Sequence, residues 1–245
     1  MKVFIVSLLR SQDRRKNIAE ELNKQKIPFE FFDAIDGREG EHELWANYNL
    51  AKRIWLTSGR PPSRGELGCF ASHYLLWERC VELDEPILII EDDSEIQPEF
   101  GQHFEQLQQS VLKYGFLRLE HENNECTLYP VEQGEAFSIS YMDANYRGTV
   151  SYTLTPSIAN KLLAHAKRWY SPVDNYIGSA FVHGVVSYKY QPEIVKNTED
   201  FASTIQHDDP DKAPLYIKPT RELYALYQRI KHWNTNRKIL KQLFG

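Results

Sequence analysis

The sequence predicts an α/β fold in which helices flank a mostly parallel sheet. Two short, continuous apolar runs, at 3–8 and 86–90, are typical of buried parallel strands. Segments with apolar residues at helical spacing follow such runs, the first over 10–26. An apolar segment at 29–32 completes a strand–helix–strand opening, which is a usual start for a nucleotide-binding domain.

The rest of the chain continues this alternation. The segment 65–83 has an apolar face at helical spacing, and the segment 157–168 follows a Thr155 cap and Pro156. We expect helices over 65–83, 100–114, 157–168 and 221–244, strands over 115–120, 148–154 and 182–190, and an irregular or strand-rich stretch over 123–146.

Composition and charge indicate an ordinary globular protein. Of the 245 residues, 42% are hydrophobic and 26% are charged. We expect one large domain over 1–205, an Asp- and Pro-rich linker over 206–220 and a basic helix over 221–245. The formal net charge of −5 argues against nucleic acid as a partner, because nucleic-acid-binding proteins usually present a basic surface.

The cysteines and the first residues suggest a cytoplasmic protein. The chain has an odd number of cysteines, Cys69, Cys80 and Cys126, and their spacing is not that of metal ligands. This fits buried or incidental thiols in a reducing compartment. The apolar opening is too short to span a bilayer, and it lacks the layout of a signal peptide.

Three acidic residues, Glu91, Asp92 and Asp93, directly follow the apolar run at 86–90. Adjacent carboxylates repel one another and resist desolvation. A fold tolerates them at a strand end when a bound cation neutralises their charge. Ligands of α/β sheets bind beyond the carboxyl ends of the strands, and carboxylate oxygens suit Mg²⁺ or Mn²⁺. The cluster therefore predicts a metal site that also contacts phosphates, with a solvated acidic turn as the alternative.

Several sequence blocks extend this interpretation. They are RSQDRR at 10–15, DAIDG at 33–37, SRGELGCFASHY at 63–74 with Trp77, IIEDD at 89–93, GTVSY at 148–152 and PVD at 172–174. Together they resemble glycosyltransferase family 25, which includes bacterial lipooligosaccharide galactosyl- and glucosyltransferases and collagen galactosyltransferases. The similarity spans roughly residues 1–197. The block from 63 to 93 is its most specific part.

The resemblance implies a GT-A type, Rossmann-like fold, a UDP-sugar donor, a divalent metal (Mn²⁺ or Mg²⁺) and inversion at the anomeric carbon. It implies galactose transfer to a lipooligosaccharide or another glycan, with glucose as the alternative sugar. The residue roles that it implies are metal binding by Glu91 and Asp93, contact with the ribose or sugar by Asp92, a uridine and phosphate pocket lined by Ser7, Leu8, Arg14 and Asp36, and a structural or pocket-lining role for His73. Ser7-Leu8 stands where the family usually has Asn-Leu.

Inverting displacement needs one carboxylate to accept the proton of the acceptor hydroxyl. Asp174 is the first candidate because it follows Pro172 in a block that resembles the family, although it could instead cap a helix. Glu120, at the end of an expected strand, is the second candidate. A third metal ligand is undecided between His183 and His207.

The C-terminal segment 221–245 differs from the rest of the chain. It carries six Lys and Arg residues against one Glu, together with several aromatic residues. A basic aromatic helix can lie on an anionic membrane and hold an enzyme near a lipid-linked oligosaccharide acceptor on the inner membrane face. Docking of this helix on the domain or on a partner subunit is the alternative.

Two other functions fit parts of the sequence. A metal-dependent nucleotidyltransferase or phosphohydrolase could use the same acidic strand end, but it would need a Gly-rich loop with Lys or Arg near the phosphate, which residues 8–15 lack. A non-catalytic glycan-binding module would gain nothing from three crowded carboxylates.

Overall fold

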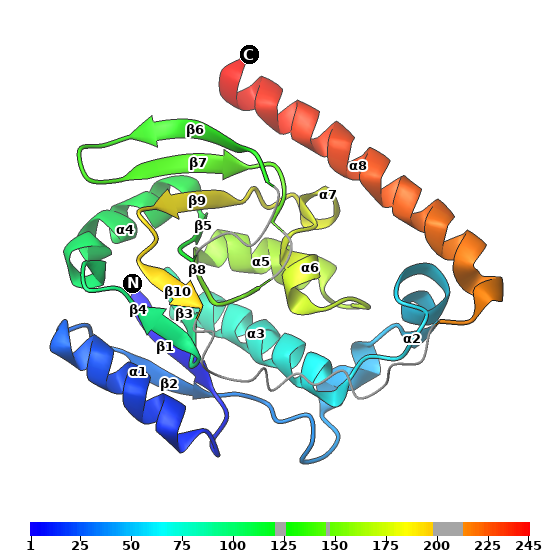
Figure 1. Ribbon diagram of the computed structural model, residues 1–245, viewed down its shortest axis with the longest axis horizontal. Helices are drawn as coiled ribbons and strands as arrows, with labels where there is room; N and C mark the ends of the chain where they lie inside the picture. Colours follow the sequence, from blue (N-terminus) through cyan, green and yellow to red (C-terminus); the bar gives the residue numbers. More distant parts are fainter. Residues whose placement is uncertain (121–125, 146–147, 198–212) are drawn as a thin grey trace.

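The computed structural model describes residues 1–120, 126–145, 148–197 and 213–245. Its centre is an eight-stranded sheet in the order β2-β1-β3-β8-β5-β9-β7-β6 (Figure 1). The strands are β1 (Lys2–Ser7), β2 (Glu30–Asp33), β3 (Ile87–Glu91), β5 (Phe116–Arg118), β6 (Leu128–Gln133), β7 (Ser138–Met142), β8 (Ser151–Leu154) and β9 (Tyr188–Gln191). Only β8 and β7 of this sheet run against the others, which confirms the predicted mostly parallel α/β class.

Helices cover both faces of the sheet, because successive residues of its buried strands point to opposite faces. On one face, Val3 and Ile5 of β1 pack with α1, α4 and the end of α8. On the other face, Phe4 and Val6 pack with α3, α5 and α6. The helices are α1 (Gln12–Lys24), α3 (Arg64–Leu83), α4 (Phe100–Tyr114), α5 (Pro156–His165), α6 (Val173–Ile177), α7 (Ala180–His183) and α8 (Lys218–Phe244).

Smaller elements connect these layers. The segment 43–57, for which the sequence gave no clear expectation, forms the 3₁₀ helix η1 (Glu43–Asn47), the short helix α2 (Leu50–Lys52) and the π-helix η2 (Arg53–Thr57). A 3₁₀ turn, η3 (Leu215–Ile217), precedes α8. A second, two-stranded sheet pairs β4 (Ser94–Ile96) with β10 (Val195–Asn197).

The helices α5 and α3 begin at residues whose side chains cap the helix. The Thr155 hydroxyl accepts a hydrogen bond from the backbone N–H of Ile158, and Pro156 opens α5 as predicted. Ser63 caps α3 in the same way, through the backbone N–H of Glu66.

The expected strand over 182–190 is wrong in its first half. Residues 180–183 form α7, and Gly184 ends it in the left-handed conformation at φ 71°. The strand β9 begins only at Tyr188. The apolar residues on either side of Gly184 resemble a strand in sequence, but they pack as a helix turn and a connecting segment.

The C-terminal helix α8 begins at Lys218 and packs on the domain (Figure 1). Near its start, the side chains of Thr220 and Arg221 donate hydrogen bonds to backbone carbonyls of η2, at 2.8 and 2.6 Å. Near its end, Ile239 is 7% exposed and belongs to the core. Of the expected linker 206–220, residues 206–212, which include His207, lie outside the described residues.

Among the described residues, no helix combines the length and the apolar character that crossing a bilayer requires.

Candidate active site

A cavity of about 820 Å³, measured with its open mouth, lies at the carboxyl ends of β1, β2 and β3. Parallel pairing brings these ends together, since Val6 of β1 is opposite Glu91 of β3 and Ser7 is opposite Asp33 of β2. The lining residues are Val6, Ser7, Leu8, Arg10, Ser11, Arg14, Ala34, Ile35, Asp36, Gly37, Arg38, Gly65, Cys69, Ser72, His73, Glu91, Asp92 and Asp93. The lining includes Ser7, Leu8, Arg14, Asp36, His73, Glu91, Asp92 and Asp93, and we call this cavity the donor pocket after the role expected for these residues. His183 does not line it, and His207 lies outside the described residues.

Asp92 faces β1 and α1. Its two carboxylate oxygens accept hydrogen bonds from the Ser7 hydroxyl at 2.5 Å and from Arg14 Nη1 at 3.3 Å. The Arg14 guanidinium also reaches Asp93 Oδ2 at 3.3 Å. Burial raises the pKa of Asp92, although the bonds from Ser7 and Arg14 counteract it. Asp92 therefore holds the Arg14 guanidinium at the edge of the pocket.

Asp93 is the carboxylate with the most unfavourable surroundings. Burial and the neighbouring charge of Glu91 raise its pKa to about 6, even though Arg14 lowers it. One guanidinium shared between two carboxylates does not neutralise the cluster. A bound cation would remove this repulsion.

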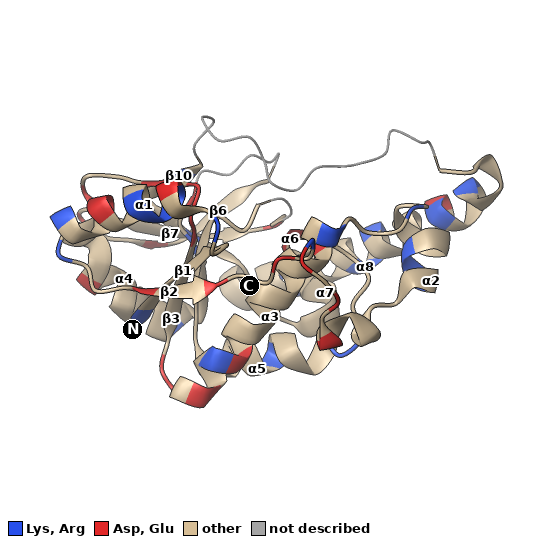
Figure 2. Ribbon diagram, turned by 90° about the horizontal axis from the view of Figure 1, so that it is seen from below, with Lys and Arg blue, Asp and Glu red and all other residues tan. Residues whose placement is uncertain are grey.

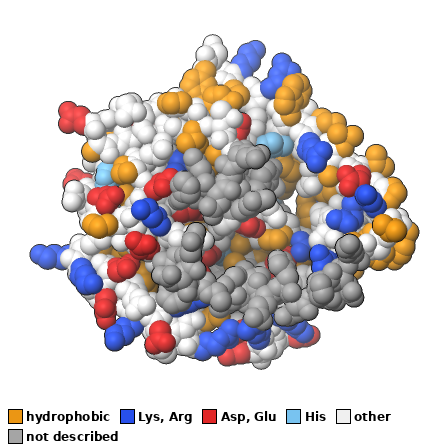
Figure 3. Space-filling view, viewed as in Figure 1, with side chains coloured by type: hydrophobic (Ala, Val, Ile, Leu, Met, Phe, Trp, Pro, Cys, Tyr) orange, Lys and Arg blue, Asp and Glu red, His pale blue; other side chains and the backbone are white. Residues whose placement is uncertain are grey.

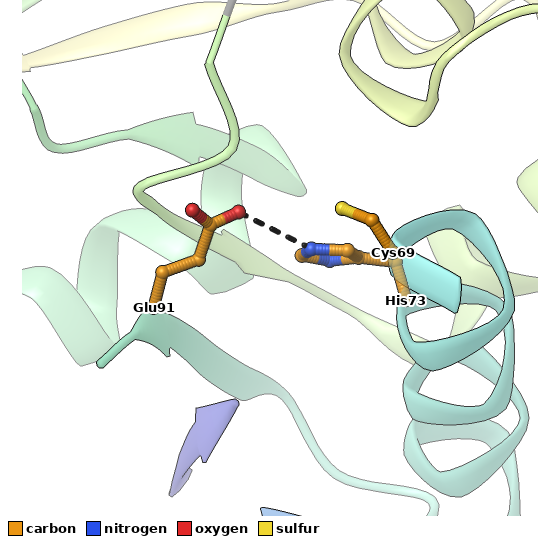
Figure 4. Close-up of side chains that lie close together, drawn as sticks. All are labelled: Cys69, His73 and Glu91. Carbon is orange, nitrogen blue, oxygen red and sulfur yellow. Dashed lines mark ion pairs between the residues drawn. The ribbon is translucent and has the colours of Figure 1, made fainter. Parts of the chain in front are cut away.

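Glu91 points in the opposite direction from Asp92, toward α3, as alternation along a strand requires. Its Oε1 accepts a hydrogen bond from the Thr149 hydroxyl and lies 3.5 Å from His73 Nε2 (Figure 4). Burial opposes its ionisation, but the nearby His73 imidazole and the Thr149 hydroxyl hold the pKa of Glu91 below its usual value. This carboxylate is therefore charged near neutral pH.

His73 is almost completely buried, at 1% exposed, and it is oriented from behind. Its Nδ1 lies 2.8 Å from the Tyr152 hydroxyl, which also accepts a hydrogen bond from Trp77 Nε1 at 3.0 Å. Its Nε2 has no hydrogen-bond partner and faces Glu91 (Figure 4). When Nδ1 carries the proton and donates it to Tyr152, Nε2 presents the lone pair that a metal ligand needs.

Cys69 lies one helical turn before His73, and its thiol belongs to the same cluster. Ligand atoms of Cys69, His73 and Glu91 all lie within 4.8 Å of one another (Figure 4). Burial and the charge of Glu91 raise the pKa of the Cys69 thiol well above its usual value, so the thiol stays protonated. Cys69 and His73 share one helix face because they are four residues apart.

The other wall of the pocket carries Arg10, Asp36 and Arg38. Asp36 forms an ion pair with Arg10. The loop that carries Asp36 packs directly on α3, where a Cβ at Gly68 would stand 2.3 Å from the Ile35 carbonyl oxygen. Only glycine fits at that position, and this close approach brings Asp36 into the pocket.

Asp174, the first candidate for the base, lies in the first turn of α6 and does not line the donor pocket. Its Oδ2 accepts a hydrogen bond from the backbone N–H of Gly148 at 3.3 Å, and its Oδ1 accepts one from the backbone N–H of Asn175 in α6 at 2.7 Å. It is close enough to the pocket for its charge to raise the pKa of Cys69. Asp174 therefore stands beside the donor pocket.

The side chains of Glu120 and His183 are engaged by other protein groups and lie outside the donor pocket. Glu120 is 5% exposed and forms an ion pair with Arg118 at 3.1 Å, outside the residues that line the pocket. His183 accepts a bond from the Val185 N–H at Nδ1, and its Nε2 donates to the Tyr176 carbonyl at 2.9 Å. Burial lowers the pKa of His183 to about 4. Both ring nitrogens are occupied, so His183 has none left for a metal.

The pocket lies at the carboxyl ends of parallel strands, which is where α/β proteins of this class bind their ligands. The family described as "Glycosyltransferase family 25 (LPS biosynthesis protein)" matches residues 1–177. The chain therefore belongs to glycosyltransferase family 25.

Individual relatives agree with this assignment. The chain is 29% identical over 191 residues to "Procollagen galactosyltransferase 1" of Danio rerio, which covers 72% of this chain and 30% of that protein. It is 38% identical over 91 residues to "Lipooligosaccharide biosynthesis protein lic2B" of Haemophilus influenzae, which covers 37% of this chain and 32% of that protein. The chain thus spans about a third of the length of these relatives.

A solved glycosyltransferase "involved in the glycosylation of the major capsid of PBCV-1" is 7% identical, with a TM-score of 0.42 over 92% of this chain and 98% of that one. A likeness this distant adds nothing to the functional assignment.

Proposed function

We propose that this chain is an inverting, metal-dependent glycosyltransferase that transfers galactose from UDP-galactose to a lipooligosaccharide or another glycan. UDP-glucose is the alternative donor. The observation that carries the proposal is the presence of three successive carboxylates in one pocket at the strand ends, where Asp92 and Asp93 share the Arg14 guanidinium and Glu91 faces His73.

The residues present fit a divalent cation. The buried Nε2 of His73 makes no hydrogen bond and lies 3.5 Å from Glu91, and burial together with the charge of Glu91 raises the pKa of Asp93. Glu91, Asp93 and His73 would hold Mn²⁺ or Mg²⁺, whereas the protonated thiol of Cys69 is a poor ligand for such hard cations. A bound cation at this place would stabilise the negative charge of a departing diphosphate.

The chain's own groups would complete the donor site. Arg14 has a guanidinium shape that matches phosphate oxygens, and Asp92 and Asp93 hold it in position. Ser7, Leu8 and Asp36 would contact the uridine and ribose at the ends of β1 and β2.

The transfer step then needs a proton acceptor. The acceptor hydroxyl oxygen would form a bond to the anomeric carbon as the bond from that carbon to the diphosphate oxygen breaks. Asp174 would accept the hydroxyl proton, and UDP would leave with the electron pair of the broken bond. Its carboxylate is half-buried beside the pocket, on the first turn of α6.

A lipid-linked oligosaccharide acceptor would place the enzyme at the inner membrane face. The outward side of α8 exposes Leu223, Leu226, Tyr227, Ile230 and Trp233, each at least 51% exposed. Basic residues accompany this stripe along the helix (Figure 2), and Figure 3 shows hydrophobic and basic side chains together at that edge of the molecule. Sedimentation with anionic liposomes tests the proposed membrane contact. Unchanged sedimentation of a variant in which Ser replaces Leu226 and Trp233 would refute this contact.

Release of UDP from UDP-galactose and UDP-glucose, with Mn²⁺ and with EDTA, tests the proposed reaction. We expect release that depends on the metal and is faster with a glycan acceptor. Release of a sugar phosphate or of pyrophosphate would instead indicate a phosphohydrolase or a nucleotidyltransferase. Binding without turnover would indicate a glycan-binding module.

A further inference from the structure

A second cavity lies between α8 on one side and η2, α6 and α7 on the other. Its volume is about 920 Å³ with its open mouth, and we call it the α8 groove. Its lining residues are Arg53, Thr57, Tyr170, Ser171, Pro172, Asn175, Ser179, Phe181, Ala225, Gln228, Arg229 and His232. The four from α8 are Ala225 and the residues three, four and seven positions after it, so one face of this helix forms a wall of the groove.

The α8 groove adjoins the donor pocket at two places in the chain. Gly65 lines the donor pocket, while its neighbour Glu66 holds Arg53 of the groove through an ion pair of 2.8 Å. Asp174 stands beside the donor pocket, and its neighbour Asn175 lines the groove. The proposed base therefore lies between the two cavities.

The groove is positively charged. Its described lining includes two arginines and no acidic residue. Arg53 uses one guanidinium nitrogen for Glu66, but its buried Nε has no hydrogen-bond partner. Arg229 is exposed, and no acidic partner is found for it among the described residues. A ligand with a negative group would satisfy both guanidinium groups.

The remaining lining suits a sugar. Asn175 and Gln228 present amide groups, which can donate to and accept from hydroxyls. The Phe181 ring lies beside the His232 ring, with centroids 6.4 Å apart, and offers an apolar surface. Burial lowers the pKa of His232, and its Nε2 already accepts a hydrogen bond from Asn236 Nδ2 at 3.1 Å.

We propose that the α8 groove binds the acceptor, and that this acceptor is a glycan carrying a carboxylate or a phosphate. The inference deepens the proposed function and rests on it for the identity of the reaction. In this arrangement Arg229 and Arg53 bind the acidic group, and the sugar next to it extends past Asn175 toward Asp174.

Binding to the full chain tests this without turnover. The probes are methyl β-glucuronide, glucose 6-phosphate, methyl β-glucoside and inorganic phosphate, each titrated by calorimetry or NMR in the presence of UDP. We expect both acidic sugars to bind about tenfold more tightly than the neutral glucoside, since a charge-assisted bond contributes about 1.5 kcal/mol. Arg229→Gln should remove most of that preference. Arg237→Gln, on α8 but outside the groove lining, should keep it.

Three results would overturn the inference. The first is equal binding of acidic and neutral sugars, and the second is an unchanged preference in Arg229→Gln. The third is binding of inorganic phosphate as tight as that of glucose 6-phosphate, which would mark an anion site without sugar recognition. UDP release without acceptor reports on the donor pocket separately. If that release is absent while the acidic sugars still bind, the proposed reaction fails and the groove assignment stands.

Discussion

Replacement of Asp93 by Asn should stabilise the metal-free protein while it removes metal binding. Asp93 has a pKa of about 6 in the folded chain, against 3.8 for the ordinary side chain. A shift of about two units corresponds to about 3 kcal/mol of unfavourable free energy when the carboxylate ionises. Asn has nearly the same shape and no charge, so Asp93→Asn avoids this cost.

The sign of the pH dependence follows from the raised pKa. Below about pH 4 Asp93 is protonated in both the folded and the unfolded chain, so it causes no loss of stability there. As the pH rises through 6, the folded chain loses up to about 3 kcal/mol relative to the variant. The difference between the two proteins reports on Asp93 together with its repulsion of Glu91 and Asp92, because removing one charge of the cluster also favours ionisation of the other two.

Urea unfolding in EDTA at pH 4 and pH 8 measures this difference. We expect Asp93→Asn and the unchanged chain to be equally stable at pH 4, and the variant to be more stable at pH 8. Added Mn²⁺ should stabilise the unchanged chain only. Glu105→Gln, an exposed change on α4, serves as the control. A variant less stable than the unchanged chain at pH 8 in EDTA would refute the argument that the cluster is strained without a cation.

Three further predictions follow from the same structure. Asp174→Asn should lower acceptor-dependent UDP release by about 10²–10⁴-fold, with UDP binding unchanged by calorimetry; near-normal release would show that another group takes the proton. Arg14→Lys should weaken UDP binding about tenfold, because the ammonium cannot form the paired hydrogen bonds of a guanidinium, and equal affinity would contradict its contact with phosphate. Phe70→Ala should cost about 3–5 kcal/mol in urea unfolding, because the Phe70 ring is fully buried and stacks on Trp169 at 4.0 Å; a loss below 1 kcal/mol would contradict that packing.

The donor pocket could be predicted from the sequence because its parts are local. The acidic residues directly follow the β3 run, and Ser7 directly ends the β1 run. Parallel pairing brings both ends to one edge, so neither side chain had to be located by distant packing. Alternation along the strand also separates Glu91 from Asp92, which agrees with their opposite directions in the structure.

The partners of those carboxylates depend on packing between distant segments. His73 reaches Glu91 only because α3 lies across the sheet and Tyr152 of β8 orients the ring. Cys69 joins them through its place on the same helix face. His183 could not be excluded as a ligand until the structure showed that both of its ring nitrogens bind backbone groups.

The α8 groove could not be predicted from the sequence, because segments from η2, from the 170–181 region and from α8 form it together. Its two arginines are separated by 176 positions, between 53 and 229, and neither lies in a block that resembles the family. The C-terminal helix α8 has two faces of different character. Ala225, Gln228, Arg229 and His232 face the groove, whereas the residues of the exposed apolar stripe alternate with them along the helix and point outward. The basic and apolar composition that suggested a membrane helix therefore divides into an inner polar wall and an outer apolar stripe. A change to one face, such as Arg229→Gln, can test acceptor binding while the residues proposed to contact the membrane stay intact.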